Sequence, residues 1–345
     1  MTDLRRVLRP LLAALALCVL AAPAAAAERQ IILAHAQRQD PANDPAAAMA
    51  DAFKRAVEAA TGGTLAVEIF PDGQLGGNRD MAGLVERGVI HSAIVTVGGV
   101  APVYPPIAVA QIPFVIDSPE AAYAVFDGPF GRRLAEEIGR RTTLHVLGFG
   151  DAGGFFVLTN ATRPIRGPED LKGLKIRTIP GFAVLDTMIR GLGGTPVRVS
   201  SRDEFTALAA GIVDGQMNSV PVIVARRYDE VQRHVTLTNH SYAPYVWVIG
   251  KAVLAGLSAE ERTVVERAAR AAIEAGRATA RRIEASDRGL PALERRMQVH
   301  VPTAGQRRAF QAAAQPMVTD YIAATFGAEG VSLMEAFFAA AKEAP

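Results

Sequence analysis

Short apolar runs alternate with helical stretches through the first half of this chain, and this alternation most constrains its fold. Apolar patterns of period two predict strands over residues 31–36, 64–70 and 92–97, and helices are predicted over 45–60 and 79–87. Parallel neighbouring strands need a long crossover connection, which a helix supplies. The order strand, helix, strand, helix, strand therefore predicts an α/β fold with a parallel sheet and helices packed on its faces.

A second unit of the same kind follows. Strands are predicted over residues 174–178 and 195–199, with a helix between them. Ser201 and Glu204 have the spacing of a capping box, in which two side chains satisfy free N–H groups, so we expect them to begin the next helix. The negative charge of Glu204 would then be stabilised by the positive N-terminal end of the helix dipole.

Length and connectivity predict two domains. The 318 residues that remain after residues 1–27 exceed what one hydrophobic core usually holds. Strands predicted over 143–149 and 245–249 both belong to the first sheet. Ser258 and Glu261 form a capping box that begins a long Ala-rich helix ending near Arg288, and shorter helices are expected nearer the C-terminus, over 306–326 and 333–342. The predicted domains comprise residues 28–153 with 244–283, and residues 154–243 with 284–345.

The N-terminus has the pattern of a secretory signal peptide. Three arginines precede an apolar run over residues 11–20, and the small residues 24–27 suit cleavage after Ala27. The alternative is a membrane anchor, but the run grades into Ala and Pro before reaching the roughly 20 apolar residues that a span needs. We therefore expect an exported, periplasmic protein. Its mature part would contain no cysteine, since the single one, Cys18, lies inside the signal peptide.

Charge argues against a nucleic-acid partner. The full chain has 37 Lys and Arg against 35 Asp and Glu, and residues 1–27 contain three arginines and one aspartate, so the mature chain is neutral. Nucleic-acid binding normally shows as a basic excess or stripe. The six histidines include no pair at metal-ligand spacing, and we expect no metal site formed by the protein alone and no cofactor. A metal ion that bridges substrate and protein is an alternative that the sequence leaves open.

One arginine stands at the end of a predicted strand. In GLKIRTIPG (173–181), apolar and charged residues alternate until Pro180 ends the strand, which leaves Arg177 at its C-terminal end. Ligands of open α/β sheets bind at that edge. A guanidinium there suits a carboxylate, because its planar fork donates two parallel hydrogen bonds. The alternative is a solvated arginine on an exposed strand face.

Several linked segments resemble one family. They are FPDGQLGGNRDM (70–81), QIPFV (111–115), DLKGLKIRTIPG (170–181), VDGQMNSV (213–220), YDEVQRHVTLTNH (228–240) and PYVWVIGK (244–251). In this order they resemble the extracytoplasmic solute receptors of TRAP transporters, the DctP family. The resemblance implies a two-domain, periplasmic-binding-protein-like fold, with a cleft between the domains and a long C-terminal helix that spans both. It also implies a receptor, not an enzyme, which captures an organic acid and delivers it to a TRAP-type membrane permease.

The resemblance assigns roles to individual residues. It implies that Arg177 clamps the substrate carboxylate and that Asn218 is a pocket amide, although an Asn beside Gly215 also suits a turn. Tyr245 is implied to lie in or near the pocket. Trp247 shares its strand face, but alternating aromatic residues are also typical of a core. Further candidates near the predicted cleft, each open to a purely structural interpretation, are His35, Asn78 and Thr96.

The chain departs from the family pattern at Phe156. Many relatives have a second arginine where this chain has Phe156, so an apolar ring replaces a cation. A dianionic substrate would lose one partner unless Arg79, Arg198 or Arg202 supplies it. The departure therefore favours an acid with one carboxylate and a less polar or hydroxylated remainder.

Other functions fit the sequence less well. Residues 148–153 match GxGxxG, but a dinucleotide site needs a helix to begin there, and FFVLT (155–159) reads as a strand. A secreted α/β hydrolase-like enzyme would need an activated nucleophile or a paired acid and base, and no such motif is found. A solute receptor that serves an ATP-driven importer or a sensor remains an alternative.

Overall fold

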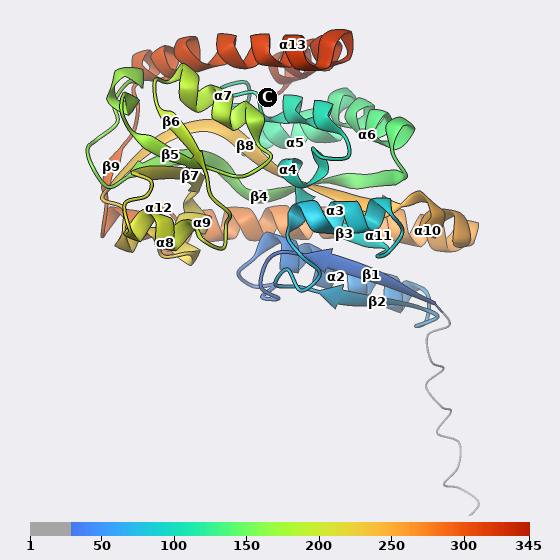
Figure 1. Cartoon of the computed structure of the whole chain (residues 1–345). Coiled ribbons are helices and arrows are strands. Elements are labelled where there is room, and N and C mark those ends of the chain that lie inside the picture. The colour runs from blue at the N-terminus through green and yellow to red at the C-terminus, as the bar shows by residue number, and fades with distance from the viewer. Residues whose placement is uncertain (1–28) are drawn as a thin grey trace, which may run out of the picture.

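The computed structural model describes residues 29–345, and the predicted signal peptide lies outside the described residues. Nine strands in this part of the chain form one continuous sheet (Figure 1). They are β1 (Arg29–His35), β2 (Leu65–Phe70), β3 (Ser92–Thr96), β4 (Leu144–Asn160), β5 (Lys175–Thr178), β6 (Thr195–Arg198), β7 (Gly215–Ser219), β8 (His234–Gly250) and β9 (Gln298–His300). Their order is β2-β1-β3-β8-β4-β7-β5-β6, with β9 paired to β8.

The first domain is built on β1, β2 and β3, which are parallel as predicted. Alternate side chains of these strands point to opposite faces, so each face has its own helices. Helices α2 (Pro45–Ala60) and α11 (Ala259–Glu284) cover one face, around Phe53 and Trp247. The other face is covered by α3 (Asn78–Glu86), α4 (Val97–Val100), η1 (Pro105–Gln111), α5 (Pro119–Asp127) and α6 (Pro129–Arg141).

The second domain is built on β5, β6 and β7. The helices α7 (Ala183–Gly191) and α13 (Ala304–Glu343) pack on one face of it. A separate apolar cluster on the other face involves α8 (Glu204–Ala209), α9 (Val220–Ala225), η3 (Tyr228–Glu230) and α12 (Leu290–Glu294). The remaining short helices are η2 (Pro168–Leu171) and α10 (Lys251–Gly256).

Two long strands join the domains. β4 and β8 are each 17 residues long and pair with each other through both domains. The sequence predicted β4 as two separate strands, over 143–149 and 155–159, and predicted only the first-domain part of β8. Their pairing is interrupted between Asp151 and Phe155, where Gly153 and Gly154 adopt φ of 105° and 87°. A bulge at this point bends the strand without ending it. The predicted domain boundaries near residues 153 and 243 fall at this bulge.

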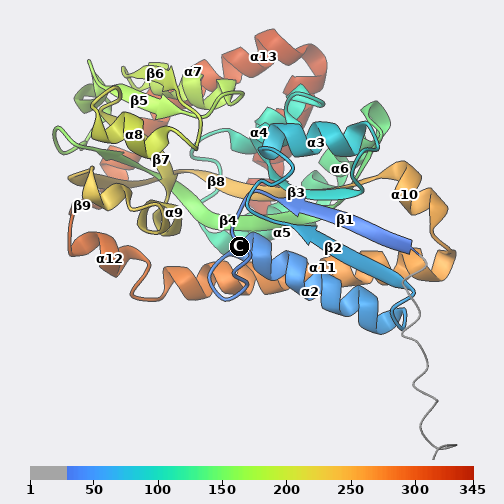
Figure 2. The same ribbon diagram turned by 60° about the horizontal axis from the view of Figure 1, so that its bottom comes forward.

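Two long helices contact both domains. α11 begins at the predicted Ser258–Glu261 capping box, lies beside α2 (Figure 2), and also contacts β4 and α9. α13 joins the two predicted C-terminal helices across a kink at Gly327, and it crosses over α6 and α7. α13 is long and apolar enough to cross a membrane by length and composition. Part of its apolar surface, including Phe310 and Phe337, is buried in the core of this fold.

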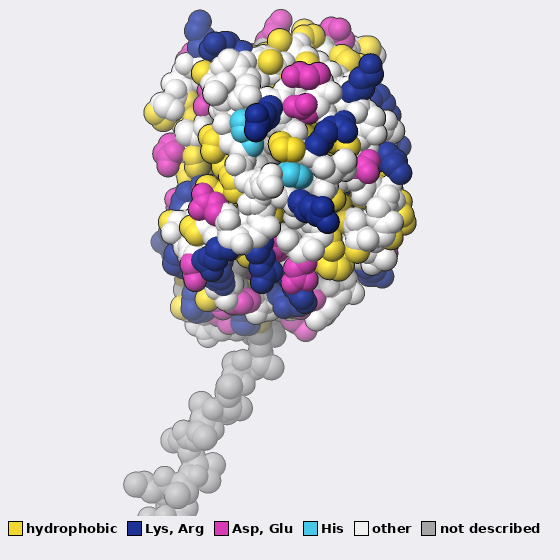
Figure 3. Space-filling model, turned by 90° about the vertical axis from the view of Figure 1, so that its left-hand side faces the viewer, with side chains coloured by type: hydrophobic (Ala, Val, Ile, Leu, Met, Phe, Trp, Pro, Cys, Tyr) yellow, Lys and Arg dark blue, Asp and Glu magenta, His cyan; other side chains and the backbone are white. Residues whose placement is uncertain are grey.

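Charge is mixed on the face at the second-domain end. Lys and Arg side chains lie among Asp and Glu side chains there (Figure 3). Such a face lacks the single-sign field that attracts nucleic acid.

Candidate functional site

Arg177 is almost completely buried at the C-terminal end of β5, with 1% of its side chain exposed. Its Nε donates to the carbonyl of Val199 at 2.9 Å, and one terminal nitrogen donates to Ser201 Oγ at 3.2 Å. The other terminal nitrogen lies 2.9 Å from Oε2 of Glu204, which is also 1% exposed. The segment after β6 therefore fixes the guanidinium, and a buried carboxylate neutralises it.

Glu204 collects donors from three elements. Besides Arg177, the Asn218 amide at the end of β7 donates to Oε1 at 3.1 Å, and the Tyr228 hydroxyl donates to Oε2 at 2.6 Å. Asn218 also donates to Oε1 of Gln216 at 2.7 Å. The structure thus brings together Arg177, which the resemblance implies to clamp a substrate carboxylate, and Asn218, which it implies to be a pocket amide. Both bind the same carboxylate, which belongs to the protein. We call Arg177, Glu204, Asn218 and Tyr228 the clamp cluster.

Burial and pairing act against each other in the clamp cluster. Burial raises the pKa of Glu204, and the nearby Arg177 opposes this rise. Burial likewise lowers the pKa of Arg177, and Glu204 opposes this fall. Because arginine stays protonated in proteins, the guanidinium keeps its charge near neutral pH, and the carboxylate beside it supplies the counter-charge.

The predicted capping box at Ser201 and Glu204 is wrong. α8 begins at Glu204, its N-cap is Asp203, and no side chain caps it. Ser201 Oγ accepts from Arg177 instead. A guanidinium buried without a counter-ion is strongly destabilising, so the long-range pair prevails over a local cap worth about 1 kcal/mol.

A cavity of about 70 Å³ lies beside the bulge in β4. Tyr245 lines it, and the Tyr245 hydroxyl accepts a hydrogen bond from Gln37 at 3.0 Å. Two opposite charges also line it, Asp44 and Arg226. Burial raises the pKa of Asp44 to about 6. The remaining lining comes from both domains: Asn43, Pro45, Ala152, Gly153, Pro221, Val222, Ala225, Ala280 and Ile283.

Arg226 connects this cavity with the clamp cluster, and sequence reasoning missed it. It is exposed, and it donates to the carbonyl of Ser201 at 3.3 Å. Its charge also lowers the pKa of Glu204. The sequence does show a cation directly after the short helix α9, which follows Asn218. The neighbouring residues, however, do not indicate in which direction the Arg226 side chain points.

The weaker candidates of the first domain have structural partners. His35 is fully buried, and its Nε2 lies 2.9 Å from Oε1 of Gln39. Burial lowers the pKa of His35. Asn78 Oδ1 accepts from the backbone N–H of Thr96 at 3.2 Å, so this pair ties the start of α3 to the end of β3. The structure brings Asn78 and Thr96 together with each other, not with Arg177.

Trp247 is placed in the core, so we no longer include it in the site. It is fully buried, its ring meets that of Phe53 edge-on at 4.9 Å, and its indole N–H donates to Ser92 Oγ at 2.9 Å. The reason is that β8 lies between β3 and β4, with helices on both faces, so this side chain has no free side.

Phe156 is also buried, with its ring centre 6.2 Å from that of His240. It therefore presents apolar surface where many relatives have a cation. Arg198 was one of the cations that could supply a second partner for a dianionic substrate. It lies on β6 and is paired with Asp186 of α7 at 2.6 Å.

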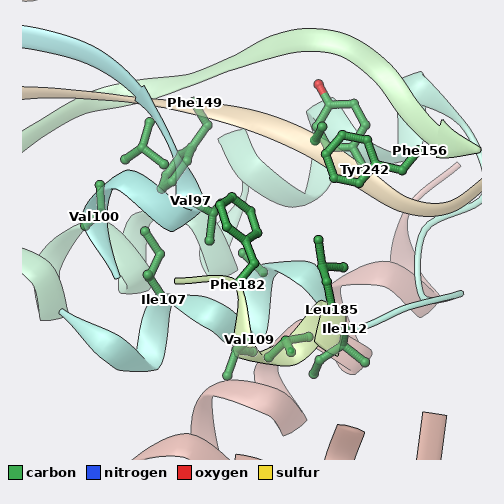
Figure 4. Close-up of a cluster of buried hydrophobic side chains, with 14 of the residues drawn as sticks. Val97, Val100, Ile107, Val109, Ile112, Phe149, Phe156, Phe182, Leu185 and Tyr242 are labelled. Carbon is green, nitrogen blue, oxygen red and sulfur yellow. The ribbon is translucent and has the colours of Figure 1, made fainter. Parts of the chain in front are cut away.

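The two domains touch next to the clamp cluster. Phe182, five residues after Arg177, packs so closely on α4 that a Cβ added to Gly98 would lie 1.6 Å from its ring. Figure 4 shows the Phe182 ring between Val97 and Leu185, with Tyr242 beyond it. The side chain of Arg79, in α3, also lies near Gly181: a Cβ added to Gly181 would be 3.6 Å from it, an ordinary van der Waals contact. These contacts join the first-domain edge to the turn that follows Arg177.

The structure also bears on the alternatives. The GxGxxG segment lies inside β4, and no helix begins there, which confirms that it does not form a dinucleotide fingerprint. Among residues 29–345, no group of three or more His, Cys, Asp and Glu side chains is arranged to hold a metal ion.

Comparisons with known proteins agree with one another. The DctP family, described as bacterial extracellular solute-binding protein, family 7, matches residues 36–324. The C4-dicarboxylate-binding periplasmic protein DctP of Rhodobacter capsulatus is 28% identical over 96% of this chain and 98% of its own length.

Two solved structures are similar throughout. A TRAP periplasmic solute-binding protein from Polaromonas sp. JS666, bound to D-erythronate, has a TM-score of 0.78 and 30% identity, and covers 89% of this chain and 98% of its own. The sugar acid binding protein of Advenella mimigardefordensis, in complex with galactonate, has a TM-score of 0.80 and 27% identity, and covers 90% and 98%. With the fold and the matched family, these similarities show that the chain belongs to the DctP family of TRAP periplasmic solute-binding proteins.

Proposed function

We propose that this protein is a periplasmic receptor that captures an organic acid through Arg177 and delivers it to a TRAP-type membrane permease. One observation carries the proposal. Arg177 and Asn218, on different strands, both donate to a single buried carboxylate, at 2.9 Å and 3.1 Å. Their geometry is therefore that of a carboxylate-binding pair, in which a charged donor and a neutral donor hold the two oxygens.

The substrate that we propose has one carboxylate and a hydroxylated remainder. Phe156 removes a cation that a second carboxylate would need, and Arg198 is already paired with Asp186. D-Erythronate and galactonate, bound by two similar proteins, are acids of this class. The Rhodobacter capsulatus relative is named for C4-dicarboxylates, so the charge of the substrate is the property to test first.

Binding would close the two domains over the acid. The bulge at Asp151–Phe155 is the natural bending point, because it interrupts the pairing of β4 with β8, the two strands that run through both domains. The contact of Phe182 with Gly98, which this structure already contains, would hold the two domains together in the closed arrangement. A buried ion pair gains strength in such a low-dielectric site. Delivery to a permease is supported by the family alone.

A thermal-shift screen of residues 28–345 tests the proposal. The panel contains glycerate, erythronate, galactonate and succinate, each paired with its neutral amide, after unfolding and refolding to remove co-purified ligand. An acid at 100 times its Kd adds about 2.7 kcal/mol to the stability of the folded state, so its melting temperature should rise by several degrees. The amides should have no effect.

The arginine itself needs a variant that folds. Arg177→Met alone leaves Glu204 buried and unpaired, so the double variant Arg177→Met/Glu204→Gln is the better probe. We expect it to fold and to bind no acid. If it binds as the wild type does, or if no acid stabilises any form of the protein, the proposed function is wrong.

A further inference from the structure

We propose that Glu204 is an internal competitor of the substrate: its carboxylate occupies the Arg177–Asn218 pair in this structure and is displaced when the acid binds. This inference rests on the proposed function, because it assigns the position of the substrate carboxylate to that pair. It adds a residue that sets affinity and selectivity from inside the protein.

The contacts of Arg177 show which partner can leave. Its Nε and one terminal nitrogen bind the carbonyl of Val199 and the hydroxyl of Ser201, which are fixed to the segment after β6. The other terminal nitrogen binds the side-chain carboxylate of Glu204, and this carboxylate can move by rotation about the side-chain bonds of Glu204. These contacts use three of the five N–H groups of Arg177, and the amide of Asn218 uses its two N–H groups for Glu204 and Gln216. A substrate carboxylate that binds both Arg177 and Asn218 therefore takes the place of Glu204.

Glu204 is placed so that it can move. It is the first residue of α8, no side chain caps that helix, and its neighbours Asp203 and Phe205 are exposed. The backbone at this point thus lies at the surface, and a change of side-chain rotamer is enough to withdraw the carboxylate. The exposed Arg226 already stabilises the charge of Glu204 and offers it a new partner next to the cavity.

Charge makes the two carboxylates exclusive. One buried guanidinium neutralises one carboxylate, and a second one at hydrogen-bond distance would repel the first in a low-dielectric site. The acid must therefore replace both the ion pair and the contacts from Asn218 and Tyr228 that hold Glu204. A bare carboxylate such as acetate replaces only these interactions and gains nothing. An acid whose remainder makes further contacts gains the difference, so the competitor selects against the smallest acids.

Two variants weaken the competitor without touching Arg177. Glu204→Gln removes its charge and leaves the guanidinium without a counter-ion, so the acid should bind at least about tenfold more tightly. Tyr228→Phe removes one hydrogen bond to Glu204, and a threefold to tenfold gain is expected. If Glu204 merely held Arg177 in place, both variants would weaken binding instead.

Matched controls are available in the same chain. Glu329 is a carboxylate paired with Arg141 at 3.3 Å, so Glu329→Gln is the control for Glu204→Gln and should leave the affinity unchanged. Tyr104 donates to Glu329 at 2.9 Å on the far side of the core, so Tyr104→Phe is the control for Tyr228→Phe.

The experiment is isothermal titration of the wild type and these variants with glycerate, erythronate, galactonate and acetate. Tighter binding in Glu204→Gln and in Tyr228→Phe, with the controls unchanged, supports the competitor, as does binding of acetate to Glu204→Gln alone. Unchanged or weaker binding in Tyr228→Phe overturns the competitor hypothesis. This test also holds if Glu204→Gln fails to fold. If the competitor hypothesis is overturned but the wild type binds an acid and Arg177→Met/Glu204→Gln does not, the proposed function still holds. Failure of both the wild type and Glu204→Gln to bind any acid refutes the proposed function itself.

Discussion

Removing either charge of the Arg177–Glu204 pair should destabilise the protein far more than removing both. Arg177 and Glu204 are each 1% exposed and 2.9 Å apart, so a single substitution leaves the other charge buried without its partner. Such a loss costs about 3–5 kcal/mol, whereas replacing a whole buried pair by neutral side chains is often close to neutral. We therefore expect about 3–5 kcal/mol for Arg177→Met, a comparable loss for Glu204→Gln, and within about 1 kcal/mol of wild type for the double variant.

Urea unfolding of residues 28–345 measures these differences, with the midpoint and slope compared between variants. The exposed pair Arg227–Glu230, whose side chains are 71% and 32% exposed, provides the control cycle and should show less than about 0.5 kcal/mol of coupling. Single-variant losses below about 1 kcal/mol, or losses that simply add in the double variant, would refute the view that these two charges depend on each other.

Three further outcomes follow from the structure. Asp151→Ala should lower the free energy of unfolding in urea by about 3–5 kcal/mol. The buried carboxylate of Asp151 accepts from two backbone N–H groups of the bulge, from a tyrosine and from an arginine. A change in free energy near zero would contradict its role in holding the bulge. Gly98→Ala should lower stability by about 1–3 kcal/mol, because its Cβ would lie 1.6 Å from the ring of Phe182, whereas Gly256→Ala meets nothing within 4 Å and should have no such effect. Burial raises the pKa of Asp44 in the folded state from its ordinary value of 3.8 to about 6, so stability is lost as the pH rises from about 4 to 6. Asp44→Asn keeps a capping side chain and should remove this loss, so it should melt at a higher temperature than wild type at pH 7 but not at pH 4.

Local sequence signals located most elements of the fold. The helix at Pro45–Ala60 matched its prediction because Asp44 caps it, accepting from the backbone N–H of Ala47 at 3.0 Å, and a proline begins it. The start of α11 followed from the capping box at Ser258 in the same way. β4 was predicted as two separate strands, because glycines that usually end a strand here form a bulge within one. Of β8, only the part over 245–249 was predicted. Pairing with a neighbouring strand decides between these outcomes, and a local pattern does not contain it.

The site was predicted in part for the same reason. Arg177 and Asn218 were identified from their segments, and the structure places both on one carboxylate. Glu204 was assigned to a helix cap, because its spacing from Ser201 fits one and its distant partner is not visible in the local sequence. Trp247 was included because alternation gives the face of a side chain, not whether a helix covers that face.

A crystal structure of residues 28–345 with the most stabilising acid tests the central claim most directly. We predict that the substrate carboxylate lies within hydrogen-bond distance of Arg177 and Asn218, and that Glu204 has turned away toward Arg226. An acid bound elsewhere, with Glu204 still paired to Arg177 as it is here at 2.9 Å, would contradict both the clamp and its internal competitor.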